Sequence, residues 1–398
     1  MRFLILTQYF PPEVGAPQVR LLAMAKELRR RGHEVDVVTA MPNYPRGEVF
    51  PGYERRWLAR EVVDGMNVTR TWIYPATGPD VLKRLVSYWS FAFSALWGCL
   101  GVPRPDYIFV ESPPLFLGVT AWLASALCRA PYIFNVSDLW PESAVSLGIV
   151  TNRTLIALAE RLERFSYRHA FRVCAVTDGI RGTIASVPGA APVLLLPNGV
   201  DLDTFRRIEP ARIDGVSDST AAFVFAGTHG YAQGLDVIVE AARRLVTRPE
   251  IRFVLVGDGP DKARLRGLAH DLPNVSFLDP VPVTAMPEIF SAARASIVPL
   301  RKLELFKGAR PSKILPSLAS ETPVIYAGEG ETADLIETNQ CGLVVPPECP
   351  EKLADAVVRL ADDPALVRRM GLQGRRLVAE KYSWENIVGH WLTEMQLQ

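Results

Sequence analysis

Short unbroken apolar runs alternate along the chain with longer segments in which apolar residues recur every three or four positions. The first run, at 3–6, has the length of a parallel strand that is covered on both faces. It leads through a long loop into an amphipathic segment at 17–31, which Gly32 closes, and then into a second strand at 34–39. This order predicts a βαβ unit with an enlarged first loop.

The same alternation continues along most of the chain and predicts an α/β protein with mostly parallel sheets. A turn-rich segment at 196–205 interrupts it, and the pattern then starts again. We therefore expect two similar parallel-sheet domains, at 1–200 and 201–382, with a ligand cleft between them. The further strands that we expect lie at 68–72, 107–111, 132–136, 172–176, 193–196, 222–227, the first part of 251–260, and 323–326.

The C-terminal part of the chain has the pattern of successive helices. Trp384 and Trp391 are seven positions apart and therefore lie on one face of the last helix. Two such large apolar side chains need a surface to pack on. We expect the segment 383–398 to pack back on the first domain.

Composition excludes several classes of protein. The net charge of +1 argues against a strongly basic nucleic-acid-binding protein, so we expect no nucleic-acid partner. Five cysteines without a CxxC pair, most of them in apolar runs, indicate reduced thiols in a cytoplasmic protein. The apolar run at 3–6 is too short for a signal peptide.

One longer apolar run, at 85–102, carries no charged residue and follows Lys83 and Arg84. Its length is at the lower limit for crossing a bilayer, and its serines, glycines and aromatic residues suit crossing poorly. Basic residues beside aromatic ones favour the headgroup region of an anionic membrane. We expect a helix that packs on the sheet with one face against a membrane; an entirely buried core helix is the alternative.

The segment 303–336 combines cations, glycines and carboxylates around two expected helix starts. The first helix is predicted to begin near Pro311, beside Arg310, Ser312 and Lys313. Helix N-termini hold anions because their first N–H groups lack partners and carry partial positive charge. The same residues also fit an ordinary helix start without a ligand.

The second helix start follows the strand at 323–326. Its glycines let the backbone approach a ligand, Glu329 and Glu331 add carboxylates, and Thr332 is predicted to cap the helix. Together the two helix starts predict a site for a phosphorylated, hydroxyl-rich ligand.

Strand ends in the first domain carry further candidates. Gly15 lies in the loop after the first strand, which lacks the GxGxxG dinucleotide fingerprint. Glu111 ends one expected strand, and Asp138 and Glu142 follow the next. Since ligands of open α/β sheets lie beyond the carboxyl ends of the strands, these three carboxylates are candidates for catalysis. Alternatively, Asp138 caps the turn before Trp140.

Several motifs follow one another along nearly the whole chain: QYFPPEVGAPQVRLLAMAKELRRRGHEVDVVTAMPNYP, SDLWPESA, LPNGVDLDTF, FAGTHGYAQGLDVIVEA, VGDGP, PSKI and GLVVPP. Each is modest alone, but their order and spacing are specific. Together they resemble retaining glycosyltransferase family 4. More narrowly, they are similar to its bacterial O-antigen and capsule branch, which includes N-acetyl-fucosaminyl transferases.

The resemblance implies the GT-B fold, with two Rossmann-like domains: the acceptor binds the first and the nucleotide sugar the second. It also implies a retaining reaction that needs no metal and no cofactor. The sequence agrees, because it has no DxD pair in a suitable loop and no cluster of His and Cys ligands. The donor-binding residues that the resemblance implies are Gly15, Gly227, His229, Gln233, Gly257, Asp258, Arg310, Ser312, Lys313, Glu329, Glu331 and Thr332.

Without a metal, cations and backbone N–H groups must stabilise the leaving diphosphate. We expect Lys313, Arg310 and the glycine loop at 227–234 to do so, and Gly15 to approach the same phosphates when the domains close. The donor's own phosphate oxygen can take the acceptor proton, which leaves the enzyme to position the substrates. His229, in the glycine loop, is the histidine that we expect at the ligand.

The chain departs from the family pattern in three places. The loop at 227–234 usually carries a lysine and an arginine, and this chain has Thr228, His229 and Gln233 there. A family glutamate that binds the ribose is replaced by Pro316, whose side chain offers no hydrogen bond.

The usual acidic partner of that glutamate, just before the helix, is also missing, because Lys307 and Gly308 take its place. The nucleoside is therefore held differently, the donor is unusual, or activity is lost. Glu321 is a candidate substitute for the missing carboxylate.

We expect a glycosyltransferase that moves an N-acetyl-aminosugar or a hexose from a nucleotide diphosphate to an undecaprenyl-diphosphate-linked glycan. It would act as a peripheral protein on the cytoplasmic face of the cell membrane. The alternatives are a GT-B nucleotide-sugar epimerase or phosphorylase, and a non-catalytic partner in a polysaccharide-assembling complex, which Pro316 supports.

Overall fold

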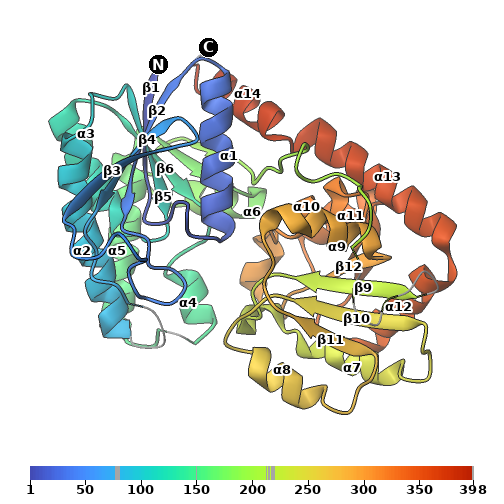
Figure 1. Ribbon diagram of the computed structural model, residues 1–398. Coiled ribbons are helices and arrows are strands. Elements are labelled where there is room, and N and C mark those ends of the chain that lie inside the picture. Colours follow the sequence, from blue (N-terminus) through green and yellow to red (C-terminus); the bar gives the residue numbers. More distant parts are fainter. Residues whose placement is uncertain (77–80, 149, 212, 214–215, 217–219, 397–398) are drawn as a thin grey trace. The chain divides into compact units, whose positions relative to one another are not determined.

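The computed structural model describes residues 1–76, 81–148, 150–211, 213, 216 and 220–396 (Figure 1). The chain divides into two compact units, each with its own parallel sheet. The first unit consists of Met1–Asn198 and Ile387–Gln398, and the second of Gly199–Asn386.

The first unit is built on an eight-stranded sheet with the order β3-β4-β2-β1-β5-β6-β7-β8. All neighbouring strands are parallel except β3 and β4, which form an antiparallel pair. The strands are β1 (Arg2–Leu6), β2 (Glu34–Ala40), β3 (Leu58–Val63), β4 (Met66–Thr71), β5 (Tyr107–Ser112), β6 (Tyr132–Val136), β7 (Arg172–Ala175) and β8 (Val193–Leu195).

The antiparallel edge strand β3 was not expected from the pattern. Asp64 and Gly65 join it to β4, and both have positive φ, at 48° and 77°. An Asp-Gly pair between two strand-like runs is a strong hairpin signal, because both central residues of the favoured turn need positive φ.

Helices cover both faces of the first sheet. Parallel crossovers are right-handed, so α1, leading from β1 to β2, and α3, leading from β5 to β6 in the opposite direction, lie on opposite faces. On the α3 face, α2, α3 and α5 pack side by side (Figure 1). The helices of this unit are α1 (Ala16–Arg30), α2 (Val81–Leu100), α3 (Leu117–Cys128), α4 (Glu142–Ser146), α5 (Arg153–His169), α6 (Asp178–Ala185) and the greater part of α14 (Trp384–Glu394).

The second unit is built on a six-stranded, fully parallel sheet with the order β11-β10-β9-β12-β13-β14. Numbered within the unit, this is the order 3-2-1-4-5-6 of doubly wound nucleotide-binding sheets. Its strands are β9 (Ala221–Ala226), β10 (Ile251–Val256), β11 (Val275–Leu278), β12 (Ala295–Pro299), β13 (Val324–Ala327) and β14 (Gly342–Val345).

Helices and short 3-10 turns connect these strands. The 3-10 turns are η1 (Tyr231–Gln233), η2 (Val283–Ala285) and η3 (Glu304–Gly308). The helices are α7 (Asp236–Arg244), α8 (Lys262–Leu268), α9 (Met286–Ala292), α10 (Ile314–Ala319), α11 (Glu331–Thr338), α12 (Pro350–Asp362) and α13 (Pro364–Lys381).

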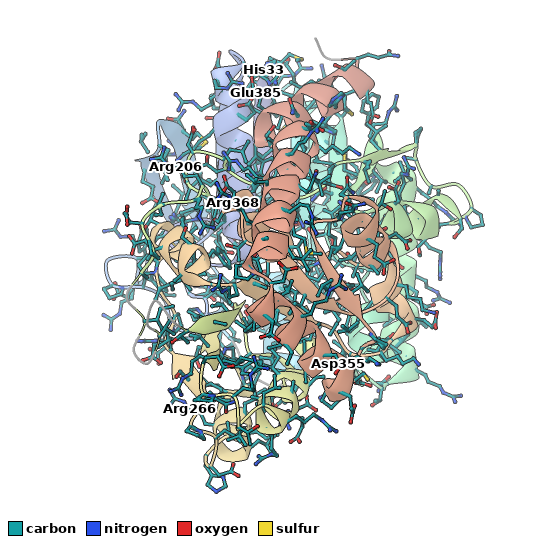
Figure 2. The ribbon with its side chains drawn as sticks, turned by 90° about the vertical axis from the view of Figure 1, so that its right-hand side faces the viewer. His33, Arg206, Arg266, Asp355, Arg368 and Glu385 are labelled. Carbon is teal, nitrogen blue, oxygen red and sulfur yellow. The ribbon has the colours of Figure 1, made fainter. Side chains whose placement is uncertain are left out.

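Alternate residues of the central strands enter two separate cores. Phe223 and Phe253 pack with α7, α12 and α13, whereas Val224 and Val254 pack with α9 on the other face. This is the two-residue period of a strand buried on both faces. The covering helices turn charged side chains outward, as the exposed side chains labelled Arg266, Asp355 and Arg368 illustrate (Figure 2).

The last helix closes the first unit. Trp391 is fully buried, with its ring centroid 6.1 Å from that of Phe3 and 5.9 Å from that of Phe109. Its indole Nε1 donates to Sγ of Cys174 at 3.3 Å. All five cysteines are free thiols.

Candidate functional site

In both sheets the strand order reverses beside the unit's first strand, between β1 and β5 and between β9 and β12. At such a point the two connections run to opposite faces and leave a crevice beyond the carboxyl ends of the strands, where α/β proteins bind ligands. In each unit the predicted site residues lie in segments that follow the carboxyl ends of strands.

Two glycine-containing loops of the second unit, after β9 and β10, pack backbone against backbone. The His229 N–H donates to the Asp258 carbonyl at 2.9 Å, and the Asp261 N–H donates to the His229 carbonyl at 3.0 Å. Gly227 and Gly257 have φ of 139° and 133°. A Cβ at Gly257 would clash with the Gly227 carbonyl. Close approach of the two loops therefore requires glycine at 257.

The Lys313 side chain lies over this glycine loop. Its ammonium is 5.5 Å from the centroid of the Phe225 ring, and a Cβ at Gly227 would clash with its Cε. Burial lowers the pKa of Lys313 to about 8, because desolvation disfavours the charged form. In the described part of the chain, no neighbouring carboxylate counteracts this shift. A bound phosphate would supply the missing negative charge.

The other two cations of the segment 303–336, Lys307 and Arg310, already face carboxylates. Arg310 Nη2 lies 3.1 Å from Glu331 Oε1, and both side chains are largely buried. Lys307 Nζ lies 3.9 Å from Glu329 Oε2. The arrangement argues against Arg310 and Glu331 as free donor contacts, because each neutralises the other. Lys313 is left as the cation that can receive a phosphate.

The imidazole of His229 does not reach the surface. It has 0% exposure and lies with its ring centroid 5.7 Å from that of Phe225 and 6.2 Å from that of Phe277. Burial, with a smaller contribution from the Lys262 charge, lowers the pKa of His229. This burial argues against the prediction that the ring contacts the donor. The His229 backbone, not its ring, organises the loop.

The helix predicted to begin near Pro311 begins three residues later, at Ile314. Ser312 is exposed before it, and Lys313 occupies the N-cap without a side-chain hydrogen bond. The helix, α10, has 6 residues. So short a helix has a small dipole, so anion attraction here must come from the Lys313 charge.

The predicted cap at Thr332 is wrong. Gly330, with φ of 84°, is the N-cap of α11, and Thr332 lies inside the first turn. The buried Thr332 hydroxyl donates to the Ala309 carbonyl at 2.9 Å. It therefore ties α11 to the segment that carries Arg310.

Two further predicted donor residues lie on the glycine loops. Gln233 is the last residue of η1, and its Oε1 lies close to Gly230. Asp258 is exposed, and its Oδ1 accepts from the Gly259 N–H at 2.9 Å. Both are at the carboxyl ends of β9 and β10, as the sequence predicted.

Pro316 is the third residue of α10, in the first turn of the helix. A missing N–H leaves no intrahelical hydrogen bond unmade there. Glu321 lies beyond the opposite end of the helix from Lys313, with φ of 58°. That position argues against Glu321 as a replacement for the family glutamate.

Lys262 is a buried residue of this region that the sequence pattern did not single out. Its ammonium donates to the Gly257 carbonyl at 2.7 Å and to Asp279 Oδ1 at 2.9 Å. Lys262 thus stabilises the glycine loop after β10. The sequence does show a lysine at the start of the helix that follows this glycine loop. Its spacing does not reveal that the side chain folds back to the Gly257 carbonyl.

In the first unit, Gly15 is the N-cap of α1, and no side chain caps the helix. A Cβ at Gly15 would lie 2.6 Å from Gln18 Oε1, an oxygen that is buried without a hydrogen-bond partner. The 15-residue helix also has proline in its first turn. An uncapped N-terminus of this length favours an anion.

Glu111, at the end of β5, is buried, and both of its carboxylate oxygens accept hydrogen bonds. Arg20 and Ser137 both donate to its Oε1, and Asn135 Nδ2 donates to its Oε2 at 2.8 Å. Arg20 Nη1 also donates to Asn198 Oδ1 at 2.9 Å. A carboxylate with this many donors argues against a catalytic base. The sequence pattern did not indicate Arg20, whose partners come from distant parts of the chain.

Asp138 and Glu142 lie after β6, where the sequence placed them. Burial by the surrounding protein raises the pKa of the Asp138 carboxyl, although part of the side chain reaches solvent; Ser143 and the Leu139 N–H oppose the shift. Glu142 is exposed at the start of α4. Asp138 thus combines a raised pKa with access to solvent.

Within the described ranges, no group of three or more His, Cys, Asp and Glu side chains is arranged to hold a metal ion.

Two family profiles match the two units in turn. Residues 15–199 match the glycosyl transferase 4-like domain, and residues 220–363 match the glycosyl transferases group 1 domain.

Known proteins resemble the chain along nearly its full length. A D-inositol 3-phosphate glycosyltransferase of Acidothermus cellulolyticus is 31% identical over 94% of this chain and 84% of its own. The Escherichia coli K12 protein WcaI, named as a candidate colanic acid biosynthesis glycosyl transferase, is 26% identical over 100% of both chains.

Solved structures share the fold at lower identity. Sucrose-phosphate synthase from Thermosynechococcus elongatus has a TM-score of 0.78 and 17% identity, covering 99% of this chain and 98% of that one. HepE of Anabaena, in complex with UDP-glucose, has a TM-score of 0.73 and 16% identity over 100% of both chains.

Proposed function

Since the chain belongs to the glycosyltransferases that join a glycosyl transferase 4-like domain to a group 1 domain, it is a transferase that uses a nucleotide sugar, and we propose that it catalyses a retaining, metal-independent transfer to a lipid-linked glycan. The observation that carries this proposal is Lys313. A half-buried, desolvated ammonium lies over a glycine loop at the switch point of a nucleotide-binding sheet, and no described carboxylate offsets its lowered pKa.

The donor diphosphate binds the second unit in this proposal. Lys313 neutralises the leaving phosphate, and the loop at 227–234 offers backbone N–H groups. The first unit, with Asp138 after one of its strands, binds the acceptor. HepE, with a similar fold, binds UDP-glucose, which supports testing UDP donors first.

In the proposed reaction the acceptor hydroxyl oxygen bonds to the anomeric carbon while the bond from that carbon to the diphosphate oxygen breaks. The acceptor proton passes to an oxygen of the leaving diphosphate. The engagement of Glu111 by three donors supports a mechanism without that carboxylate as base or nucleophile. The protein contributes position and charge.

The acceptor that we propose is an undecaprenyl-diphosphate-linked glycan in the assembly of a bacterial polysaccharide such as O-antigen or capsule. The transferred sugar would be an N-acetyl-aminosugar, as in the N-acetyl-fucosaminyl transferases, or a hexose. WcaI, with a name that refers to colanic acid, supports a role in polysaccharide synthesis.

A membrane-facing helix supports a lipid-linked acceptor. On α2, Trp89, Phe93 and Trp97 are 52%, 61% and 55% exposed on one stripe, although each is a large apolar residue. Lys83 and Arg84 lie in the first turn of the same helix. We propose that this stripe rests on the cytoplasmic face of the cell membrane.

No helix among the described residues is both long enough and apolar enough to span a bilayer.

The test is transfer from a panel of UDP-, GDP- and dTDP-sugars to undecaprenyl-diphosphate-linked sugars. Mass spectrometry detects the product, NMR gives its anomeric configuration, and EDTA tests the need for a metal. We expect retention of configuration, activity in EDTA, and a loss of about 10²–10³-fold in kcat for Lys313→Met, as for removal of one transition-state donor. Failure of every donor to react, together with no binding of UDP, GDP or dTDP, would contradict the proposal.

A further inference from the structure

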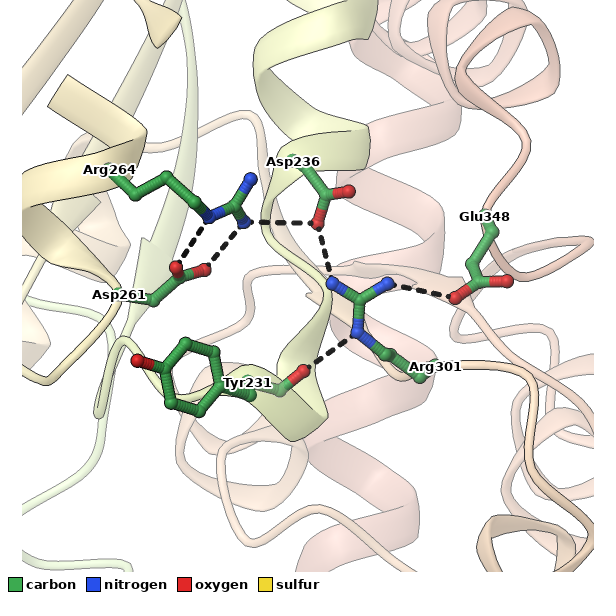
Figure 3. A network of polar contacts seen from close by, with 6 residues as sticks. All are labelled: Tyr231, Asp236, Asp261, Arg264, Arg301 and Glu348. Carbon is green, nitrogen blue, oxygen red and sulfur yellow. Dashed lines mark hydrogen bonds and ion pairs between the residues drawn. The ribbon is translucent and has the colours of Figure 1, made fainter. Parts of the chain in front are cut away.

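Arg301 is the second residue after β12, at the switch point of the second sheet. It forms hydrogen bonds with the glycine loop at 227–234 (Figure 3). Its backbone N–H donates to the Ala232 carbonyl at 3.0 Å. Its Nε donates to the Tyr231 carbonyl at 2.9 Å. Two successive carbonyls of η1 are therefore fixed by one residue.

The loop is rich in glycine, so its conformation depends on contacts with its neighbours. Gly227, Gly230 and Gly234 give it unusual backbone freedom, and no side chain caps η1. Gly234 has φ of 57°, and a Cβ at that position would lie 3.2 Å from Arg301 Cγ. The loop thus packs directly on the stem of Arg301.

The guanidinium is itself fixed by carboxylates from two other loops. Nη1 lies 3.1 Å from Glu348 Oε1, after β14, and Nη2 lies 3.3 Å from Asp236 Oδ1, at the start of α7 (Figure 3). All three guanidinium nitrogens of Arg301, Nε, Nη1 and Nη2, therefore contact protein acceptors. Arg301 is therefore placed to hold the loop.

A second arginine extends the network to the other glycine loop. Arg264 binds both oxygens of Asp261, at 2.6 and 2.8 Å, and lies 3.7 Å from Asp236 (Figure 3). The Asp261 N–H in turn holds the His229 carbonyl. The network therefore holds three carbonyls of the loop, those of His229, Tyr231 and Ala232.

We propose that Arg301, supported by Asp236, Arg264 and Asp261, is a positioning residue that fixes the loop at 227–234 in its phosphate-binding form before the donor arrives. The inference rests on the proposed function, because it presumes that the donor diphosphate binds this loop. A loop of three glycines that is fixed in advance loses less conformational freedom on binding than a mobile one, and so binds the diphosphate more tightly.

The test compares Arg301→Met and Arg301→Lys with the wild type. Calorimetry measures the Kd for whichever of UDP, GDP and dTDP the wild type binds most tightly. Hydrogen exchange of the ligand-free proteins reports on the amides of 227–234. For Arg301→Met we expect a Kd and a donor KM raised about tenfold, kcat within about threefold, and faster exchange confined to the loop.

The lysine variant separates position from charge. A lysine keeps the positive charge but cannot reproduce the planar fork that binds a carbonyl and two carboxylates together. We expect Arg301→Lys to remain impaired in Kd and in loop protection. Full recovery by lysine would assign the effect to charge alone and overturn the inference.

Arg244→Met is the matched control. Arg244 pairs with Glu351 on the exposed side of the same unit, at comparable exposure, and is not part of the network. We expect its Kd to stay within about twofold of the wild type. If Arg301→Met fails to fold, Glu348→Gln removes one outer support and should raise the Kd about two- to threefold.

The outcomes separate the two proposals. Normal binding by the wild type with an unchanged Kd and unchanged loop protection in Arg301→Met overturns this inference and leaves the proposed function standing. If the wild type binds none of the three nucleotides and transfers no sugar, the proposed function fails and this inference fails with it.

Discussion

The fold desolvates the Lys313 ammonium and lowers its pKa. Stability and ligand binding therefore both depend on pH through this residue. The folded-state pKa of about 8 is below the ordinary lysine value, so between the two values the unfolded chain binds more protons. The free energy of unfolding should therefore increase as pH rises through this range. A bound diphosphate acts in the opposite direction, because its negative charge favours the protonated amine and raises the pKa.

We expect nucleotide affinity to fall as pH is raised above about 8, because Lys313 loses its charge there. The decrease should approach tenfold per pH unit if one proton is involved. Calorimetry with UDP from about pH 7 to about pH 9.5 measures it, above the range in which the phosphate itself titrates. Lys313→Met should bind more weakly and lose this dependence. A parallel pH profile in the variant would assign the titration to another group.

Helix α2 is apolar on both of its faces, which is unusual for a helix at a protein surface. Phe91, Ala95 and Cys99 are buried on its inner face. The outer stripe, which contains Trp89 and Trp97, faces solvent. The core therefore does not explain the outer aromatic residues, whereas a bilayer headgroup region suits tryptophan well.

Replacing Trp89, Phe93 and Trp97 with serine should weaken binding to phosphatidylglycerol vesicles by at least about tenfold, since each ring removed takes apolar area out of the membrane. Co-sedimentation measures the change. Leu155→Ser with Leu158→Ser is the control, because both leucines are exposed on α5. Equal binding by the α2 variant and the wild type would show that this stripe is not the membrane surface.

The chain passes between its two units twice, after Asn198 and before Ile387, so the first unit is completed by residues from the end of the sequence. The two passages are joined inside the second unit, where the Val200 N–H donates to the Tyr382 carbonyl at 2.9 Å and Val200 bridges to Ser383. Stability of the first unit therefore depends on α14, which is far from the first sheet in the sequence.

Trp391→Ala should destabilise the first unit by about 3–5 kcal/mol, because it leaves a cavity against Phe3 and Phe109. Urea unfolding followed by fluorescence measures the loss. Trp97→Ala, which removes an exposed tryptophan from the same unit, should change the unfolding free energy by less than about 1 kcal/mol. Similar losses in the two variants would mean that α14 contributes little to this core.

Sequence patterns predicted most of the fold because buried parallel strands leave a local mark. Each strand is a short apolar run, each crossover helix has an apolar face, and both signals fit inside a few residues. The strands at 3–6, 107–111 and 132–136 lie within β1, β5 and β6. Strand β3 was not predicted, because its residues are mixed in polarity and partly exposed and so form no apolar run. The turn residues Asp64 and Gly65 were the sequence signal for the β3–β4 hairpin.

The site was predicted less completely, for a physical reason. The sequence by itself determined the type of fold, the family resemblance and the glycine loops, because these follow from short-range patterns. It could not tell which charges remain free. Tertiary structure alone decided that Arg310 meets Glu331, that Glu111 meets Arg20 and that His229 is buried. It also decided that no carboxylate among the described residues offsets the desolvation of Lys313. Each of these outcomes depends on side chains far apart in the chain, whose meeting no local spacing encodes.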